Sequence, residues 1–171
     1  MGERQKLSRE EFKEQLKTVK LLSLDVDGVL TDGGLYYMED GTELRKFNVK
    51  DGMGIKCARA EGLEICIISA STTNAIKERG ERLGLEHVYI GAKNKIDILN
   101  QICENLKIDL SNVAHIGDDI NDISIMEKIG TPITVCDAMQ TVKNKTIYIS
   151  EKAGGMGAVR EICDMWIEVN S

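Results

Sequence analysis

Two acidic side chains directly follow a short apolar segment near the start of the chain. Leu21 to Val26 reads as a buried strand, and Asp25 and Asp27 stand at its end. Side chains at positions i and i+2 of an extended segment point the same way, so both carboxylates are expected to face one spot. Gly28 comes next, and it allows the backbone to turn sharply and a ligand to approach closely.

Three further stretches place reactive side chains where a strand is expected to end or a helix to begin. They are Ser69, Lys95 and the acidic group Asp118, Asp119 and Asp122. Each stretch is a weak signal alone, because a lone Asp-x-Asp-Gly is usually a solvated turn and a lone Ser usually a helix cap. The carboxyl ends of parallel strands meet at one edge of a sheet, where open α/β sheets bind ligands. The four stretches together therefore predict one site.

A cluster of carboxylates at one edge requires a compensating cation. Two like charges about 4 Å apart repel by roughly 4 kcal/mol at an effective dielectric constant of about 20. Oxygen ligands without His or Cys favour a hard ion such as Mg²⁺, whose coordination shell is completed by water and phosphate. The amine of Lys95 and the hydroxyl of Ser69 would add positive charge and hydrogen bonds for an anion. The sequence therefore predicts a Mg²⁺ site that binds a phosphate.

The elements that must position these residues alternate between strands and helices. Strands are expected at residues 21–26, 63–68, 88–90, 113–116, 133–135 and 146–149. Helices are expected at residues 8–19, 50–62, 71–83, 95–106, 121–129 and from 158 to about 169. This order predicts an α/β, Rossmann-like fold: a doubly wound parallel sheet with helices on both faces. Residues 34–48 read as two β segments joined by an Asp-Gly turn, which predicts a protruding β-hairpin arm.

Length and composition favour a single domain over residues 1–171. The chain has 171 residues, 42% of them hydrophobic, and a net charge of −6 with both signs spread along it. This balance argues against a nucleic-acid partner. No apolar run approaches the ~20 residues that span a membrane, and the charged start is unlike a signal peptide, so no membrane association and a cytoplasmic location are expected. The five cysteines are read as reduced packing residues.

Four motifs resemble those of the haloacid dehalogenase superfamily of phosphohydrolases. They are DVDGVLT at 25–31, a strand closing on Ser69, Lys95 in GAKNKI, and GDDIND at 117–122. The resemblance implies that Asp25 is the nucleophile and forms an aspartyl-phosphate. It also implies that Asp27 protonates the leaving alkoxide and later deprotonates the hydrolytic water.

The same resemblance implies which residues hold the metal and the substrate. Mg²⁺ would bind Asp25, the backbone carbonyl of Asp27 and Asp118. Asp119 and Asp122 would lie behind these metal ligands and orient them. The residues implied in substrate contact are Asp27, Gly28, Ser69, Ala70 and Lys95, of which Ser69 and Lys95 would hold the phosphoryl oxygens. Arg79 matches a basic position of the family and could pair with a sugar-acid carboxylate.

A closer likeness extends over most of the chain. Residues 31–55 and 153–164 are similar to the 3-deoxy-D-manno-octulosonate 8-phosphate phosphatases and their nonulosonate 9-phosphate relatives. These enzymes lack a cap domain, and the short spacings from Asp25 to Ser69 and from Ser69 to Lys95 leave no room for one. The resemblance implies a homotetramer in which the arm of one subunit encloses the site of its neighbour. The apolar residues of the arm agree with this expectation.

The resemblance implies a Mg²⁺-dependent phosphatase of a sugar-acid phosphate, with the eight-carbon octulosonate 8-phosphate as first candidate. A nonulosonate 9-phosphate is the alternative substrate, because Ser71 matches neither the Arg of the octulosonate enzymes nor the Glu of the nine-carbon enzymes. A non-catalytic tetrameric scaffold, like domains attached to acylneuraminate cytidylyltransferases, is a further alternative. Residues 154–160 match the glycine-rich tail of the family, which either closes a neighbouring site or only leads into the last helix.

Overall fold

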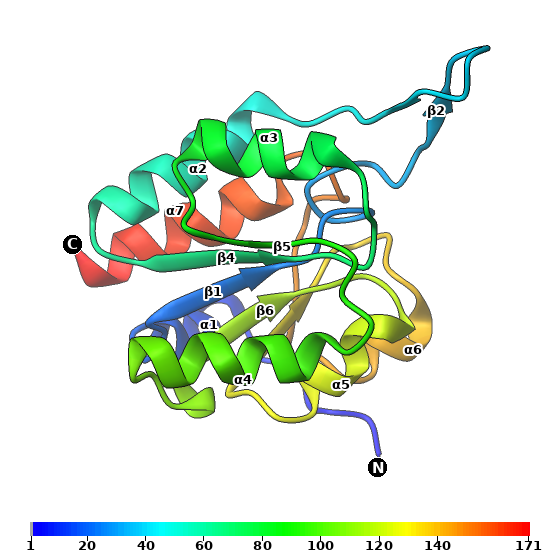
Figure 1. The fold of residues 1–171 in the computed structure, drawn as a ribbon. Helices are drawn as coiled ribbons and strands as arrows, with labels where there is room; N and C mark the ends of the chain where they lie inside the picture. Colours follow the sequence, from blue (N-terminus) through cyan, green and yellow to red (C-terminus); the bar gives the residue numbers. More distant parts are fainter. Residues whose placement is uncertain (1) are drawn as a thin grey trace.

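The computed structural model describes residues 2–171, and its centre is a six-stranded parallel sheet with the strand order β5-β4-β1-β6-β7-β8 (Figure 1). The strands of this sheet are β1 (Leu21–Leu24), β4 (Glu64–Ile68), β5 (His87–Tyr89), β6 (Val113–Ile116), β7 (Thr131–Thr134) and β8 (Tyr148–Ile149). The helices are α1 (Arg9–Leu16), α2 (Val49–Ala60), α3 (Asn74–Leu83), α4 (Lys95–Leu106), α5 (Ile123–Met126), α6 (Gln140–Lys143) and α7 (Ala158–Asn170). Two 3₁₀ turns, η1 (Leu110–Asn112) and η2 (Ile120–Asp122), flank β6. The α/β class and the doubly wound sheet are confirmed.

The register of the central strands brings the predicted reactive segments to one edge. Leu24, the last residue of β1, pairs with Ile67 of β4 and with Ile116 of β6. Asp25 directly follows Leu24, Ser69 comes two residues after Ile67, and Asp118 comes two residues after Ile116. Parallel pairing thus aligns segments that are far apart in the chain.

Helices cover both faces of the sheet and complete two apolar cores. The helices α2, α3 and α7 lie on one face, while α4 and α5 lie on the other (Figure 1). The helix α1 contributes Phe12 and Leu16 to the first core, where Phe12 stacks on Tyr148 with ring centroids 3.8 Å apart. Buried apolar faces of this kind supply most of the free energy that fixes helices on a sheet.

A thin arm extends away from this body. It consists of β2 (Tyr36–Tyr37) and β3 (Glu43–Leu44), which pair antiparallel as the Asp-Gly turn predicted (Figure 1). Gly41 in the turn has φ +83°, a conformation that favours glycine. The arm and its turn are confirmed, and residues 2–171 contain no cap domain inserted between the strands.

Several expected boundaries differ from those observed. The first strand ends at Leu24 and not at Val26, because the Val26 carbonyl turns back to accept hydrogen bonds from the amides of Leu30 and Thr31. The first helix keeps the predicted capping box of Ser8 and Glu11 but spans fewer residues than 8–19. The expected helix at 121–129 is split between η2 and α5, and the short helix α6 was not predicted.

No helix among residues 2–171 has both the length and the apolar character needed to cross a membrane.

Candidate active site

The loops at the carboxyl ends of β1, β4 and β6 enclose a cavity of about 250 Å³. Its lining residues include Asp25, Asp27, Gly28, Ser69, Ala70, Ser71, Asp118 and Asp119. The wall is mainly polar, and most of the predicted site residues face it. The convergence predicted from the strand ends is therefore observed.

Asp25 is held firmly at the floor of the cavity. Its Oδ1 accepts a hydrogen bond from the Val26 amide at 2.7 Å, and its Oδ2 lies 2.7 Å from Nζ of Lys95. Burial and the nearby Asp122 carboxylate raise the pKa of Asp25 to about 8, against the opposing effect of Lys95. The charged form of Asp25 therefore needs more positive charge than Lys95 alone provides.

Asp122 and Lys95 form a buried network beneath Asp25. Lys95 Nζ lies 2.6 Å from Oδ1 of Asp122, which also lies 3.0 Å from Nε2 of His115. The amide of Asp118 donates to Oδ2 of Asp122 at 3.2 Å. Burial acts to raise the pKa of Asp122, but the hydrogen bonds from His115 and Lys95 outweigh it and hold that pKa below its ordinary value. In turn, burial acts to lower the pKa of Lys95, but Asp25 and Asp122 raise it. Asp122 is therefore ionised and Lys95 charged.

The carboxylates fit a hard divalent cation. One oxygen from each of Asp25, Asp118 and Asp122 lies within 4.8 Å of the others. Burial, together with Asp122 and Asp119, raises the pKa of Asp118 to about 7. Burial disfavours the ionised forms of Asp25 and Asp118, and Asp122 beside them is already charged, so a cation would stabilise the group. The donor atoms are all oxygens, which suits Mg²⁺.

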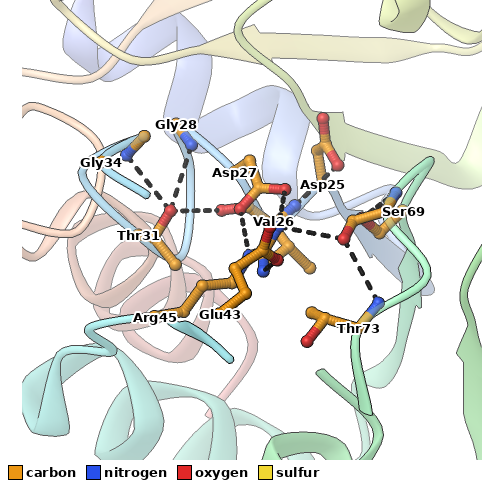
Figure 2. A network of polar contacts seen from close by, with 12 residues as sticks. Asp25, Val26, Asp27, Gly28, Thr31, Gly34, Glu43, Arg45, Ser69 and Thr73 are labelled. Carbon is orange, nitrogen blue, oxygen red and sulfur yellow. Dashed lines mark hydrogen bonds and ion pairs between the residues drawn. The ribbon is translucent and has the colours of Figure 1, made fainter. Parts of the chain in front are cut away.

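The turn after β1 carries Asp27 and is braced by Thr31. The Thr31 hydroxyl accepts hydrogen bonds from the amides of Gly28 and Gly33 and donates to the Val26 carbonyl (Figure 2). Gly28 has φ +79°, and a Cβ at this position would collide with the Asp118 carboxylate. Only glycine lets the turn approach β6 so closely.

Ser69 lies on the opposite wall, in the loop that leaves β4. Its amide donates to the Tyr89 carbonyl at 2.9 Å, and its Oγ accepts from the Ser71 amide at 3.2 Å. The Ser69 residue is only 1% exposed, yet it lines the cavity with Ala70 and Ser71. A hydroxyl fixed in this way is placed to donate its proton to an anion in the cavity.

Two predicted residues lie elsewhere than expected. Lys95 is 2% exposed and lies behind Asp25 and Asp122, so it does not line the cavity. Asp119 was expected behind the metal, but it lies exposed at the rim, where its carboxylate accepts from the Ile120 amide and caps η2. The 3₁₀ turn that replaces the first turn of the expected helix directs it outward.

Arg79 lies outside this cavity. One Nη donates to the Asn48 carbonyl at 2.9 Å, and the guanidinium lies 5.4 Å from the ring centroid of Phe47. Arg79 lines a separate cavity of about 270 Å³, together with Arg45 and Phe47. Its Nε has no hydrogen-bond partner among residues 2–171, and its predicted contact with a substrate carboxylate stays a prediction.

Two residues of the site were not predicted from the sequence. His115 is fully buried, and its ring bridges Ser23 Oγ and Asp122 Oδ1 at 3.0 Å each. The signal available in the sequence was its place on a predicted strand, two residues before Gly117, where the GDDIND motif begins. Arg45 of the arm reaches the carboxylate of Asp27, and its only signal was a charge between the apolar residues Leu44 and Phe47.

Comparisons with known proteins show the family of this chain. The family model of haloacid dehalogenase-like hydrolases matches residues 87–162. The 3-deoxy-D-manno-octulosonate 8-phosphate phosphatase KdsC of Escherichia coli (strain K12) is 42% identical over 149 residues, which cover 87% of this chain and 79% of the relative. The enzyme of the same name from Yersinia pestis is 37% identical over 147 residues, covering 86% of this chain and 79% of the relative.

Solved structures share the fold over nearly the whole chain. The Moraxella catarrhalis 3-deoxy-D-manno-octulosonate 8-phosphate phosphatase in complex with magnesium ion, phosphate ion and KDO has a TM-score of 0.91 and 33% identity, covering 95% of this chain and 93% of that one. The cobalt-bound Haemophilus influenzae phosphatase has a TM-score of 0.87 and 31% identity, covering 91% of each chain. The chain belongs to the 3-deoxy-D-manno-octulosonate 8-phosphate phosphatase family of haloacid dehalogenase-like hydrolases.

Proposed function

We propose that this chain is a Mg²⁺-dependent phosphomonoesterase that removes phosphate from a sugar-acid phosphate, with 3-deoxy-D-manno-octulosonate 8-phosphate as the first candidate. The observation that carries the proposal is the convergence of the buried acids Asp25 and Asp122 and the partly buried Asp118, with Lys95 beneath them. The names of the relatives support the substrate, since they are phosphatases of this compound.

In this proposal Asp25, Asp118 and the backbone carbonyl of Asp27 hold Mg²⁺. The bound ion would supply positive charge for the phosphoryl oxygens and offset the repulsion between the carboxylates. The raised pKa values of Asp25 and Asp118 support this assignment, because the first acid is buried and the second partly buried, without enough positive charge around them.

The first chemical step transfers the phosphoryl group to Asp25. A carboxylate oxygen of Asp25 forms a bond to phosphorus while the bond between phosphorus and the sugar oxygen breaks. Asp27 gives its proton to that leaving oxygen, so the sugar departs as a neutral alcohol. Ser69 Oγ donates to a phosphoryl oxygen, and Lys95 favours the ionised form of Asp25 from beneath.

The second step regenerates the protein. Asp27, now ionised, takes a proton from water as the water oxygen bonds to phosphorus and the bond from phosphorus to Asp25 breaks. Inorganic phosphate leaves, and Asp27 again carries the proton needed for the next cycle. The same carboxyl group therefore serves as acid and then as base, which requires it to face the same spot in both steps.

We further propose that the chain assembles as a homotetramer in which the arm of one subunit covers the site of its neighbour. The arm carries five apolar side chains that are about half exposed: Leu35, Tyr36, Tyr37, Met38 and Leu44. An apolar two-stranded hairpin is not stable in water by itself, and exposed apolar patches usually mark contacts between proteins.

A phosphate-release screen with Mg²⁺ tests the enzymatic proposal. The substrates are the octulosonate 8-phosphate, a nonulosonate 9-phosphate and neutral hexose phosphates, and the Asp25→Asn variant is the control. We expect the eight-carbon compound to give the highest kcat/KM and Asp25→Asn to abolish release while the fold is unchanged. Preference for the nine-carbon compound would change the substrate, equal rates on all compounds would indicate a broad phosphomonoesterase, and no release would favour a scaffold.

A further inference from the structure

Arg45, at the base of the arm, reaches into the site of its own chain. Its Nε donates to Oδ1 of Asp27 at 2.7 Å and one Nη donates to Oδ2 at 3.1 Å, a two-point contact with one carboxylate. The same Nη donates to Oγ of Ser71 at 2.9 Å. Figure 2 shows Arg45 beside Asp27. The arm therefore contacts the site of the subunit to which it belongs, whatever its tip contacts.

The guanidinium of Arg45 has little capacity left to bind a substrate anion. Its side chain is 3% exposed, and its other Nη is paired with the carboxylate of Glu43. Four of the five N–H donors of an arginine are thus engaged, and two carboxylates balance its single charge. A group with this arrangement holds other groups in place and does not itself bind the phosphate.

Asp27 depends on this contact for its orientation. Its side chain is 35% exposed at the cavity, and among residues 2–171 Arg45 supplies the hydrogen bonds to its carboxylate. Asp25, in contrast, is fixed by Lys95 and by the Val26 amide. A partly exposed carboxylate without a partner would sample several rotamers, whereas a planar two-point contact fixes both its direction and its plane.

We propose that Arg45 is a positioning residue that orients the Asp27 carboxyl group toward the leaving-group oxygen of the substrate. This inference rests on the proposed function, in which Asp27 gives a proton to that oxygen. Each carboxyl oxygen has two lone pairs, so Asp27 can accept from Arg45 and still carry the proton on a remaining pair. Arg45 stays charged throughout and exchanges no proton itself.

The dependence on the leaving group distinguishes this role from a structural one. A sugar alkoxide is a poor leaving group that must be protonated, whereas p-nitrophenolate departs without a proton. The kcat/KM value reflects the steps through departure of the leaving group, so it isolates the acid step from the later hydrolysis. We therefore compare the sugar-acid phosphate with p-nitrophenyl phosphate, using the full-length chain with Mg²⁺.

We expect Arg45→Gln to lower kcat/KM for the sugar-acid phosphate by roughly 10- to 100-fold, a large part of what general acid catalysis contributes. The value for p-nitrophenyl phosphate should stay within about threefold. Arg45→Lys, which keeps the charge but not the two-point contact, should lie between Arg45→Gln and the wild type. The matched control is Lys46→Gln, the next residue of the arm, whose amine pairs with Asp32, and it should change neither value.

Equal losses on both substrates would overturn the proposal and assign Arg45 a structural role, as would no loss on either. Thermal unfolding and sedimentation of each variant check the fold and the assembly, and the same comparison made with Arg45→Lys decides the matter if Arg45→Gln does not fold.

Failure of the proposed function is a separate result: the wild type would then release no phosphate from a sugar-acid phosphate. If the wild type releases phosphate and Asp25→Asn does not, the function stands whatever the Arg45 variants show.

Discussion

At the level of single residues, the site is a balance between burial and charge. Asp25 and Asp118 have pKa values raised to about 8 and about 7, while hydrogen bonds from His115 and Lys95 hold Asp122 ionised. The network therefore carries one permanent negative and one permanent positive charge, and two acids whose ionisation requires a further cation. A divalent ion would supply the charge that allows Asp25, the proposed nucleophile, to be ionised near neutral pH.

This balance predicts how pH changes the effect of Mg²⁺ on stability. Unfolded aspartates ionise near pH 4, whereas folded Asp25 and Asp118 keep their protons to about pH 8 and about pH 7. The metal-free folded state thus binds more protons across this range, so its free energy of unfolding falls as pH rises from about 4 to about 8. Mg²⁺ binds the ionised carboxylates of the folded state, so we expect the stabilisation it gives to be larger at pH 8 than at pH 5.

Urea unfolding with Mg²⁺ or with a chelator, at the two pH values, measures this effect. Asp118→Asn is the control, because it removes one of the acids proposed to bind the ion, and its stability should respond little to Mg²⁺. A stabilisation by Mg²⁺ that is the same at both pH values in the wild type would contradict the prediction.

At the level of elements, the glycine-rich loop before α7 supports the turn that carries Asp27. The Gly155 amide donates to the Val29 carbonyl at 2.9 Å, and the Gly155 carbonyl accepts from Nδ2 of Asn48 at 2.9 Å. The Gly154 amide donates to Asp137 at 3.0 Å. This loop packs on the site of its own chain, and closure over a neighbouring site stays a prediction.

Gly154→Ala tests this support. A Cβ at Gly154 would collide with the backbone carbonyls of Gly28 and Thr31, and backbone atoms cannot move aside as a flexible side chain can. We expect the free energy of unfolding to fall by about 1–3 kcal/mol, the usual effect of overpacking, and kcat/KM to fall because the Asp27 turn is displaced. Chemical unfolding and kinetics measure both. Met156→Ala, at an exposed position of the same loop, should change the stability little, and a similar loss there would refute the argument.

At the level of the whole molecule, the fold of one chain does not explain why the arm exposes apolar side chains to solvent. Tyr37 is 64% exposed and Met38 is 55% exposed, while the two apolar cores are buried elsewhere in the sheet and its helices. The arm extends from the body into solvent (Figure 1). Its apolar residues would be covered only in an assembly.

A double variant, Tyr36→Ser with Met38→Ser, tests the proposed assembly. We expect sedimentation velocity to show smaller species than for the wild type, because two apolar side chains of the proposed contact are lost. Far-UV circular dichroism should be unchanged, since neither side chain belongs to a core. Glu39→Gln is the matched control at the tip of the arm, because it alters a charge and no apolar surface. A wild type that sediments as a monomer at micromolar concentration would refute the tetramer.

The sequence by itself determined which segments meet at the site. Asp25, Ser69 and Asp118 each follow an apolar run, and parallel strands all end at one edge, so the spacing along the chain was enough to predict their convergence. The helix at 95–106 was predicted with its observed bounds, because its apolar residues recur with helical periodicity. These features are local, or follow from the topology of a parallel sheet.

Only the tertiary structure decided where individual side chains point. The structure places Lys95 beneath Asp25, turns Asp119 to the rim and leaves Arg79 on the Asn48 carbonyl. It also brings Arg45 to Asp27, 18 positions earlier in the chain. The physical reason is that backbone pairing fixes where a strand ends, whereas the direction of a side chain depends on which partner, often distant in sequence, is near enough to satisfy its charge and hydrogen bonds.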